Sequence, residues 1–314
     1  MRARKLATHV VIALAILVVG MGATDGKISL RLNPEDGVVY ETTTSVKTTT
    51  RTTIAATEAT ATWQMDTVLE MEFEPDVESG FTASTMIDSI SLAMDGAAGE
   101  QAADLSATIA SPMDGLLSWL EGGWFTITLS PTGQVTDVFG IDELAAELFE
   151  ESDASDPSTG LVQEALRQQF GDDTMRRTMS QSFVPFPEGA IAVGASWSTR
   201  TAAFGVRMDS TYTLTDVAEG IATVAVTGTM ELDTAYEPDG EAPAIVYEEL
   251  HGSQEGTYLV DARTGVPLEV DIRQETTATI PTSLPGLPEE VAAQMTAISF
   301  STTSTVHVET RKLD

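Results

Sequence analysis

Apolar and polar residues alternate along most of this chain with a period of two. The stretch "ATVAVTGTMEL" (222–232) places valine and methionine on one side and threonine on the other, and "QMDTVLEMEFE" (64–74) and "ISFSTTSTVHVE" (298–309) repeat the pattern. This is the period of a β-strand with one face buried and one face in water. The residues expected on the buried side of the first two stretches are Met65, Leu69, Met71, Phe73, Val224, Val226 and Met230.

Threonine dominates the stretch "ETTTSVKTTTRTTIAATEATATW" (41–63). A threonine-rich tract can also be a disordered stalk, but such stalks are rich in proline and this tract has none. Threonine is a strong strand former. The tract therefore predicts two long strands that meet near residues 55–57.

The middle of the chain has helical spacing instead. The stretch "SPMDGLLSWLEGG" (111–123) begins with Ser-Pro and ends in glycine, which predicts a short helix. Two further stretches, 141–151 and 159–170, carry apolar residues three or four positions apart. We therefore expect a single β-rich domain of two β halves, 24–140 and 184–314, joined by a helical insertion at 141–183, with Leu161 and Phe170 of that insertion packed against the sheet.

Two short segments resemble each other as hairpin corners. "SPTG" (130–133) and "DARTG" (261–265) both place Ser or Asp at the start of a turn and Gly where φ must be positive. The charges of "YLVDARTGVPLEVDI" (258–272) could suggest a catalytic cluster, but Asp261 and Arg263 belong to this turn and Asp271 to the next strand. Pro267 predicts a sheet edge or a bulge there.

The first 23 residues have the form of a secretory signal peptide. Arg2, Arg4 and Lys5 precede an apolar run at 10–19, and small residues end at Ala23. The run is short for a membrane span, which needs roughly 20 apolar residues; an uncleaved anchor is the alternative. We expect a periplasmic or extracellular bacterial protein with no membrane span after cleavage.

The charge balance excludes some partners. The chain has 48 acidic and 16 basic residues, and a net charge of −32. Such a surface repels nucleic acid. It is also typical of adaptation to concentrated salt, although ordinary solubility of a secreted protein explains it too.

Few residues are suited to catalysis or metal binding. The chain has no cysteine, and outside the signal peptide its histidines are His251 and His307, both expected at the surface. No nucleophile elbow, P-loop or dinucleotide-binding motif occurs. We therefore expect no enzyme activity, no cofactor and no His/Cys metal centre; a carboxylate-based hydrolase is the weakest hypothesis, and weak calcium binding at "ESDASDPSTGLVQE" (151–164) stays open. Core packing is expected for Trp63, Trp119, Trp124 and Trp197.

Four stretches carry a resemblance: "GVVYETTTSV", "FTITLSPTGQVTDVFGIDEL", "FPEGAIAVGASW" and "YLVDARTGVPLEV". They resemble a family of exported bacterial proteins known only as a domain of unknown function. The architecture that this resemblance implies is similar to that of the Lol-type lipoprotein carriers, in which helices plug the concave side of a curved antiparallel sheet. The fold class expected is therefore α+β, mainly β, with a long, curved, half-barrel-like antiparallel sheet and a few helices packed on its concave face.

Two functions follow as hypotheses. The first is an envelope protein that binds a lipid, an acyl chain or another hydrophobic ligand on the inward residues named above, with Leu161 and Phe170 as the plug. The alternative is a structural or protein-interaction module of the cell surface, without a small-molecule ligand.

Overall fold

The computed structural model describes residues 26–54, 57–76, 80–95, 117, 120–149, 171–203, 205–233, 247–280 and 298–313. Its strands are β1 Lys27–Ile28, β2 Val39–Ile54, β3 Thr57–Asp76, β4 Gly80–Asp95, β5 Trp124–Leu129, β6 Val135–Phe139, β7 Ile191–Ala192, β8 Ser196–Ala203, β9 Val206–Ala218, β10 Ile221–Leu232, β11 Glu249–Asp261, β12 Pro267–Ile280 and β13 Ile298–Lys312. Its helices are α2 Ile141–Phe149 and α4 Asp172–Ser182. Within these ranges, none of the helices is long and apolar enough to cross a membrane.

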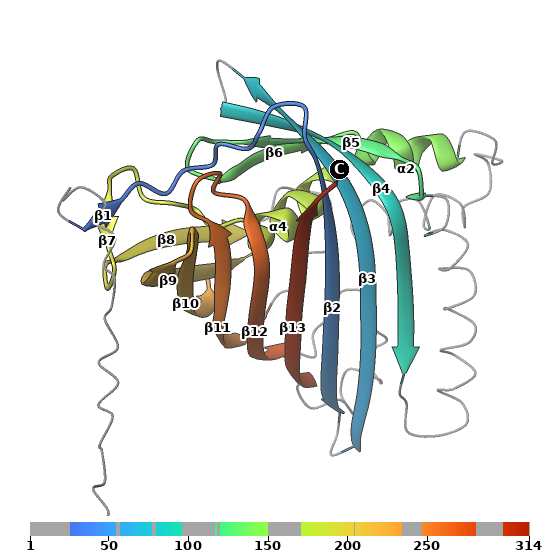
Figure 1. The fold of residues 1–314 in the computed structure, drawn as a ribbon. Coiled ribbons are helices and arrows are strands. Elements are labelled where there is room, and N and C mark those ends of the chain that lie inside the picture. Colours follow the sequence, from blue (N-terminus) through green and yellow to red (C-terminus); the bar gives the residue numbers. More distant parts are fainter. Residues whose placement is uncertain are drawn as a thin grey trace, which may run out of the picture.

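One sheet of 11 strands dominates the molecule, in the order β6-β5-β4-β3-β2-β13-β12-β11-β10-β9-β8, and every neighbouring pair is antiparallel. The two β-rich stretches of the sequence meet where β2 pairs with β13. The sheet is open and curls around α4 and α2 (Figure 1). This arrangement confirms the expected fold class, a mainly β protein with a large curved antiparallel sheet and a few short helices.

The threonine-rich tract folds as the two strands predicted from it, because β2 ends at Ile54 and β3 begins at Thr57. The helix expected at 141–151 is α2. Leu117 and Leu120 are helical and buried, in agreement with the short helix predicted there. The helix expected at 159–170 and the loop at 151–160 lie outside the described residues.

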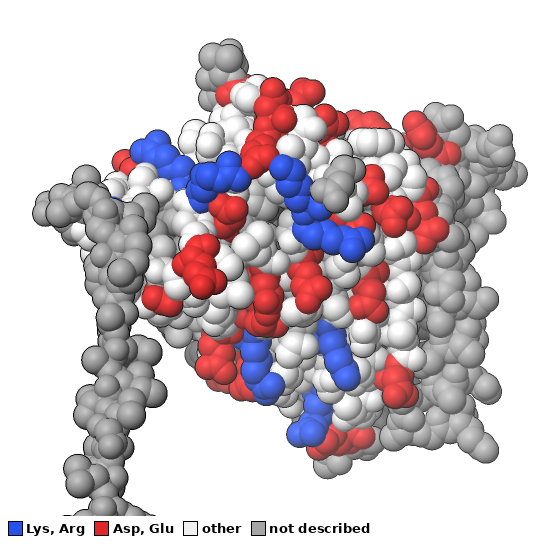
Figure 2. All heavy atoms as spheres, viewed as in Figure 1, with Lys and Arg blue, Asp and Glu red and all other residues white. Residues whose placement is uncertain are grey.

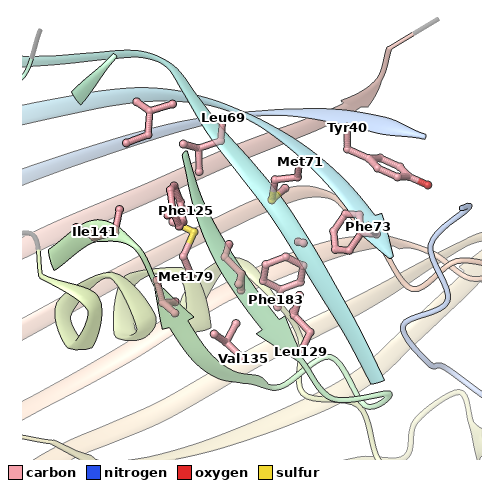
Figure 3. Close-up of a cluster of buried hydrophobic side chains, with 14 of the residues drawn as sticks. Tyr40, Leu69, Met71, Phe73, Phe125, Leu129, Val135, Ile141, Met179 and Phe183 are labelled. Carbon is pink, nitrogen blue, oxygen red and sulfur yellow. The ribbon is translucent and has the colours of Figure 1, made fainter. Parts of the chain in front are cut away.

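The core consists of two clusters on the concave side of the sheet, which we call the inner face. The first cluster joins β3, β4 and β5 to the helices, and Figure 3 shows Met179 from α4 and Phe183, the residue after α4, among its side chains. The second cluster lies on β9 to β13. The N-terminal segment (29–36) connects them, since Leu30 packs in the second cluster and Leu32 in the first.

Both predicted corners form tight turns. Asp261 accepts hydrogen bonds from the backbone N–H groups of Arg263 and Thr264 through its carboxylate, at 2.8 and 3.0 Å. Gly133 and Gly265 have φ of +78° and +69°. The charges of "DARTG" therefore build a turn, as predicted. Pro267 begins β12, an interior strand, at a shift in its register with β11, so the bulge rather than the edge is the correct alternative.

The two corners also hold other parts of the chain, which the sequence did not indicate. The N-terminal segment runs across both, because Leu32 N donates to Pro131 O and Asn33 N donates to Thr264 O, at 3.0 and 2.6 Å. A Cβ on Gly265 would collide with the backbone of Arg31. The corners thus clamp the segment that joins the two core clusters.

Candidate functional site

The inner face of the sheet carries no charged side chain over its central rows. Because neighbouring strands pair in register, the inward residues line up in rows across the sheet. Two rows are mainly apolar: Leu214, Val224, Tyr258, Val270, Val308 and Thr44, then Tyr212, Val226, Gly256, Ile272, Val306, Val46, Met65 and Leu92. The next two are mainly polar and uncharged on the central strands: Ser210, Gly228, Gln254, Gln274, Ser304, Thr48, Trp63 and Met94, then Met208, Met230, Gly252, Thr276, Thr302, Thr50 and Ala61.

The polar rows satisfy their own hydrogen bonds. Gln254 is buried, donates to Ser210 Oγ at 2.8 Å and accepts from Gln274 at 3.3 Å. Thr48 and Ser304 share a hydrogen bond of 2.9 Å. A buried polar group without a partner is costly, so this pairing stabilises the inner face without introducing charge.

A small cavity lies between α4 and the sheet, on the side of the apolar rows. Its volume is about 10 Å³, room for roughly one water molecule. Its lining is almost entirely apolar and comes from β2, β3, β12, β13, α4 and neighbouring residues. The residues that line it are Thr42, Thr44, Leu69, Met71, Phe73, Met179, Ser182, Phe183, Val266, Pro267, Val308 and Thr310.

Helix α4 covers this cavity with a narrow apolar stripe. Met175, Met179 and Phe183 recur every four residues and pack on the first cluster. The other residues of α4 are polar or charged, so the helix buries little apolar surface. Figure 3 shows Phe183 close to Met71 and Phe73 of β3.

Hydrogen bonds fasten the two ends of α4. At its start, the Asp172 carboxylate accepts from the backbone N–H of Ile141 and of Asp142, at 2.9 and 3.3 Å. Burial raises the pKa of this carboxyl. At its end, the Tyr258 hydroxyl donates to the carbonyl of Gln181 at 3.0 Å. Burial raises the pKa of Tyr258 well above its ordinary value.

The strand residues expected to contact a ligand all point toward the inner face, where the structure buries most of them. Leu69, Met71 and Phe73 of β3 line the cavity. Val224 and Val226 of β10 belong to the second cluster. Met65 of β3 and Met230 of β10 are partly buried in the inward rows.

The residues expected to form the plug, Leu161 and Phe170, lie outside the described residues. Met179 of α4 and Phe183, which directly follows the helix, occupy the inner face instead, and the sequence interpretation missed them. Their signal was present as the four-residue spacing in "MRRTMSQSF" (175–183).

Charge is concentrated on the opposite, outer face of the sheet. Figure 2 shows acidic and basic side chains spread over the strands turned toward the viewer. Many form ion pairs between neighbouring strands, such as Arg207 with Glu231 at 2.8 Å and Arg51 with Glu58 at 2.8 Å. The two faces of the sheet therefore differ in charge much more than in their content of hydroxyl groups.

His307 points outward, as predicted, but it has close partners. Its Nδ1 lies 2.8 Å from an oxygen of Asp271, and its Nε2 lies 3.3 Å from an oxygen of Glu309. The hydrogen bond with Asp271 raises the pKa of His307. Ligand atoms of Glu269, Asp271 and His307 lie within 4.8 Å of one another, an arrangement that can hold a divalent cation. A protonated His307 balances the same carboxylates without one.

A second hollow lies at the ends of β2, β11, β12 and β13, with a volume of about 280 Å³. Hydroxyl groups, Arg51, Glu249 and His251 line it together with Ala278 and Phe300, and it is open to water. Its charged side chains and its openness make it less suited to an alkyl chain than the cavity under α4.

Trp124 corrects the expectation that the tryptophans pack in the core. It begins β5 on the outward side and is 58% exposed. Phe139, paired with Thr126 on edge strand β6, is 53% exposed. Trp63 and Trp197 are partly buried, and Trp119 lies outside the described residues.

Residues 78–267 match a family of unknown function, DUF6263, a range that runs from the start of β4 to the start of β12. No curated protein matches the chain.

Solved structures resemble the chain only distantly. A structure titled "Lipid-protein interactions in lipovitellin" has 9% identity and a TM-score of 0.47, and the match covers 88% of this chain and 26% of that one. Crystal structures of OccK7 (OpdD) and OpdL from Pseudomonas aeruginosa have 6% and 8% identity, with TM-scores of 0.22 and 0.18; each match covers 88% of this chain and, in turn, 100% and 99% of theirs. The likeness of the architecture to that of the Lol-type lipoprotein carriers therefore stays a prediction.

Proposed function

This chain belongs to the DUF6263 family of unknown function, and we propose that it binds a hydrophobic ligand, such as a lipid or an acyl chain, on the inner face of its sheet. The observation that carries the proposal is the absence of Asp, Glu, Lys and Arg from the central inner rows. Charged residues make up 20% of the chain. Their exclusion from one face of a long sheet is what burial of an apolar partner requires.

The cavity under α4 supports the same proposal. Its lining is apolar, and the helix that closes it is fastened at its ends and packs through methionines in between. Methionine is flexible and fills irregular spaces, so it adapts to a partner of changing shape.

The remainder of the proposal concerns where the protein works. We infer from the signal-like N-terminus that it is exported to the periplasm or the extracellular space, and from the lack of catalytic motifs that it acts by binding. The acidic outer face fits a partner that is neither nucleic acid nor an anionic membrane surface.

Binding of a fluorescent alkyl probe, a decanol with a terminal pyrene, tests the proposal. Met65 points inward from β3, and Gln64 beside it points outward and hydrogen-bonds Asp66 at 3.0 Å. We expect Met65→Lys to weaken probe binding by roughly tenfold or more, because the ammonium group of the lysine must lose its hydration. Gln64→Lys, which can still pair with Asp66, is the matched control and should bind normally.

Thermal unfolding of both variants checks that they fold, and Met65→Gln replaces Met65→Lys if the lysine does not. The proposal fails if the wild-type protein does not bind the probe, or if the inward and outward substitutions have equal effects.

A second candidate function is a protein-interaction module. Exposed Trp124 and Phe139 on the outer side of strands β5 and β6 favour it, since exposed aromatic residues are enriched at interfaces. Sedimentation velocity of the wild type and of a Trp124→Ser/Phe139→Ser variant tests for self-association through this edge. A wild-type protein that stays monomeric at high concentration would argue against that form of the function.

A further inference from the structure

Thr44 is the one described residue of the cavity with a fully buried side-chain oxygen that has no hydrogen-bond partner. Thr44 is buried, with an exposed fraction of 6%, and its Oγ1 makes no hydrogen bond. Two residues away, Thr42 Oγ1 shares a hydrogen bond of 3.2 Å with Thr310 Oγ1. On the β13 side, Thr42 faces Thr310 whereas Thr44 faces Val308, which has no polar side chain. On the β3 side Thr44 faces Thr67, with which its hydroxyl makes no hydrogen bond.

The surroundings of Thr44 determine what can bind there. Leu69, Met71, Phe73 and Val308 supply apolar surface to the cavity, and none of the described residues that line it is charged. A carboxylate placed here would lose its water without gaining a counter-charge, which is unfavourable. A neutral group that can give or accept one hydrogen bond fits instead.

The cavity must widen to hold more than about one water molecule, and α4 is the part of its wall suited to moving. Near Thr44 the helix contributes Met179, Ser182 and Phe183. The four strands on the other side, β2, β3, β12 and β13, are interior strands with neighbours on both edges, and are therefore the more rigid wall.

We propose that this cavity is the closed form of a binding site for a single alkyl chain with a neutral polar group, such as an alcohol or ester, which hydrogen-bonds to Thr44 when α4 shifts outward. This inference rests on the proposed function and specifies its ligand. Thr44 provides the selectivity for the polar group, and the side chains of Met179 and Phe183 move aside to admit the alkyl chain.

Displacement of the pyrene-decanol probe by three competitors tests the inference: 1-decanol, decanoate and 1-chlorodecane, which has the chain without a hydroxyl. We expect wild-type protein to bind 1-decanol about five- to tenfold more tightly than 1-chlorodecane, the worth of one hydrogen bond. Decanoate should bind more weakly than 1-decanol at pH 8. Thr44→Val should remove the preference for the alcohol, and Thr44→Ser, which keeps the hydroxyl, should retain it.

Thr49→Val is the matched control, because it removes an outward hydroxyl of the same strand that hydrogen-bonds Thr62 and does not line the cavity, and it should leave the preference unchanged. If the probe binds but Thr44→Val keeps the preference, the role of Thr44 is refuted while the proposed function stands. If decanoate displaces the probe best, the neutral class is refuted. If the probe binds but none of the competitors displaces it, this inference is refuted. If the probe itself does not bind, the proposed function fails as well.

Discussion

At the scale of single residues, Thr44 carries the one fully buried side-chain oxygen on the described strands of the inner face that makes no hydrogen bond. We predict that Thr44→Val, which removes the buried hydroxyl and keeps the shape, raises the free energy of unfolding by about 1 kcal/mol. Urea unfolding of the purified variant measures the change.

Thr42→Val provides the comparison for this prediction. It breaks the hydrogen bond between Thr42 and Thr310, and should lower the free energy of unfolding by about 1 kcal/mol. A loss of stability in both variants would mean that Thr44 is already satisfied in the folded protein.

His307 makes stability depend on pH. Its pKa is raised by Asp271, so the ion pair stabilises the fold fully below the unfolded pKa of about 6.5. This contribution is lost as pH rises through the raised pKa of the folded state. We predict that the free energy of unfolding falls less above pH 6.5 in His307→Gln than in the wild type. The difference should be less than about 1 kcal/mol because the pair is exposed.

Urea midpoints of wild type, His307→Gln and Asp271→Asn between pH 6 and pH 9 measure this effect. The two variants should behave alike. An unchanged slope in both would show that the pair adds nothing to stability.

At the scale of elements, the glycine corners hold the N-terminal segment. Gly37 and Gly265 both have φ of +69°, but a Cβ on Gly37 would meet nothing, whereas one on Gly265 would collide with Arg31. We predict that Gly37→Ala costs about 1–2 kcal/mol from its backbone conformation alone. Gly265→Ala should cost roughly 1–3 kcal/mol more, because the clamp must open.

Thermal or urea unfolding of these two variants isolates the clamp, since the backbone strain is common to both. Equal losses would show that the contact with Arg31 is not part of the stable fold.

Helix α4 should open before the sheet does. Met179 is buried on the side of the helix that packs on the first cluster, whereas Ser180 is exposed and its hydroxyl donates a hydrogen bond to the Arg176 carbonyl. We predict that Met179→Ala makes the amides of 175–182 exchange hydrogen at least roughly tenfold faster, while the amides of β12 and β13 keep their protection.

Hydrogen exchange followed by mass spectrometry measures this, with Ser180→Ala as the control that should change nothing. Equal acceleration in α4 and in the central strands would mean that the helix and the sheet unfold together, and that α4 is not a separate lid.

The strands were predictable because alternation fixes which side of each strand is buried, and Met71 and Val226 illustrate it. The charge-free rows were not predictable, since a row depends on the register between strands far apart in the sequence. The cavity required both the register of Thr44 against Val308 and the docking of α4. Sequence spacing indicates the apolar stripe of α4 but not the surface on which it packs.

At the scale of the whole molecule, the net charge of −32 opposes folding through repulsion. We predict that the unfolding temperature rises between 0.05 and 1 M KCl at pH 7.5, since the Debye length falls to roughly 3 Å at 1 M. The same series near pH 4.5, close to the pI of about 4.1, should give a smaller rise. Equal responses at both pH values would mean that screening of net charge is not the cause.

The distribution of that charge also supports the proposed function, because the sheet places it outward and leaves the inner face uncharged. The central claim is that this inner face accepts an alkyl chain beneath α4. Crystallography with 16-bromohexadecanol, using the anomalous scattering of bromine, tests it most directly. The account predicts a bromine peak on the inner face between α4 and strands β2, β3, β12 and β13; a peak only on the outer face beside Trp124, or none at saturating ligand, would contradict it.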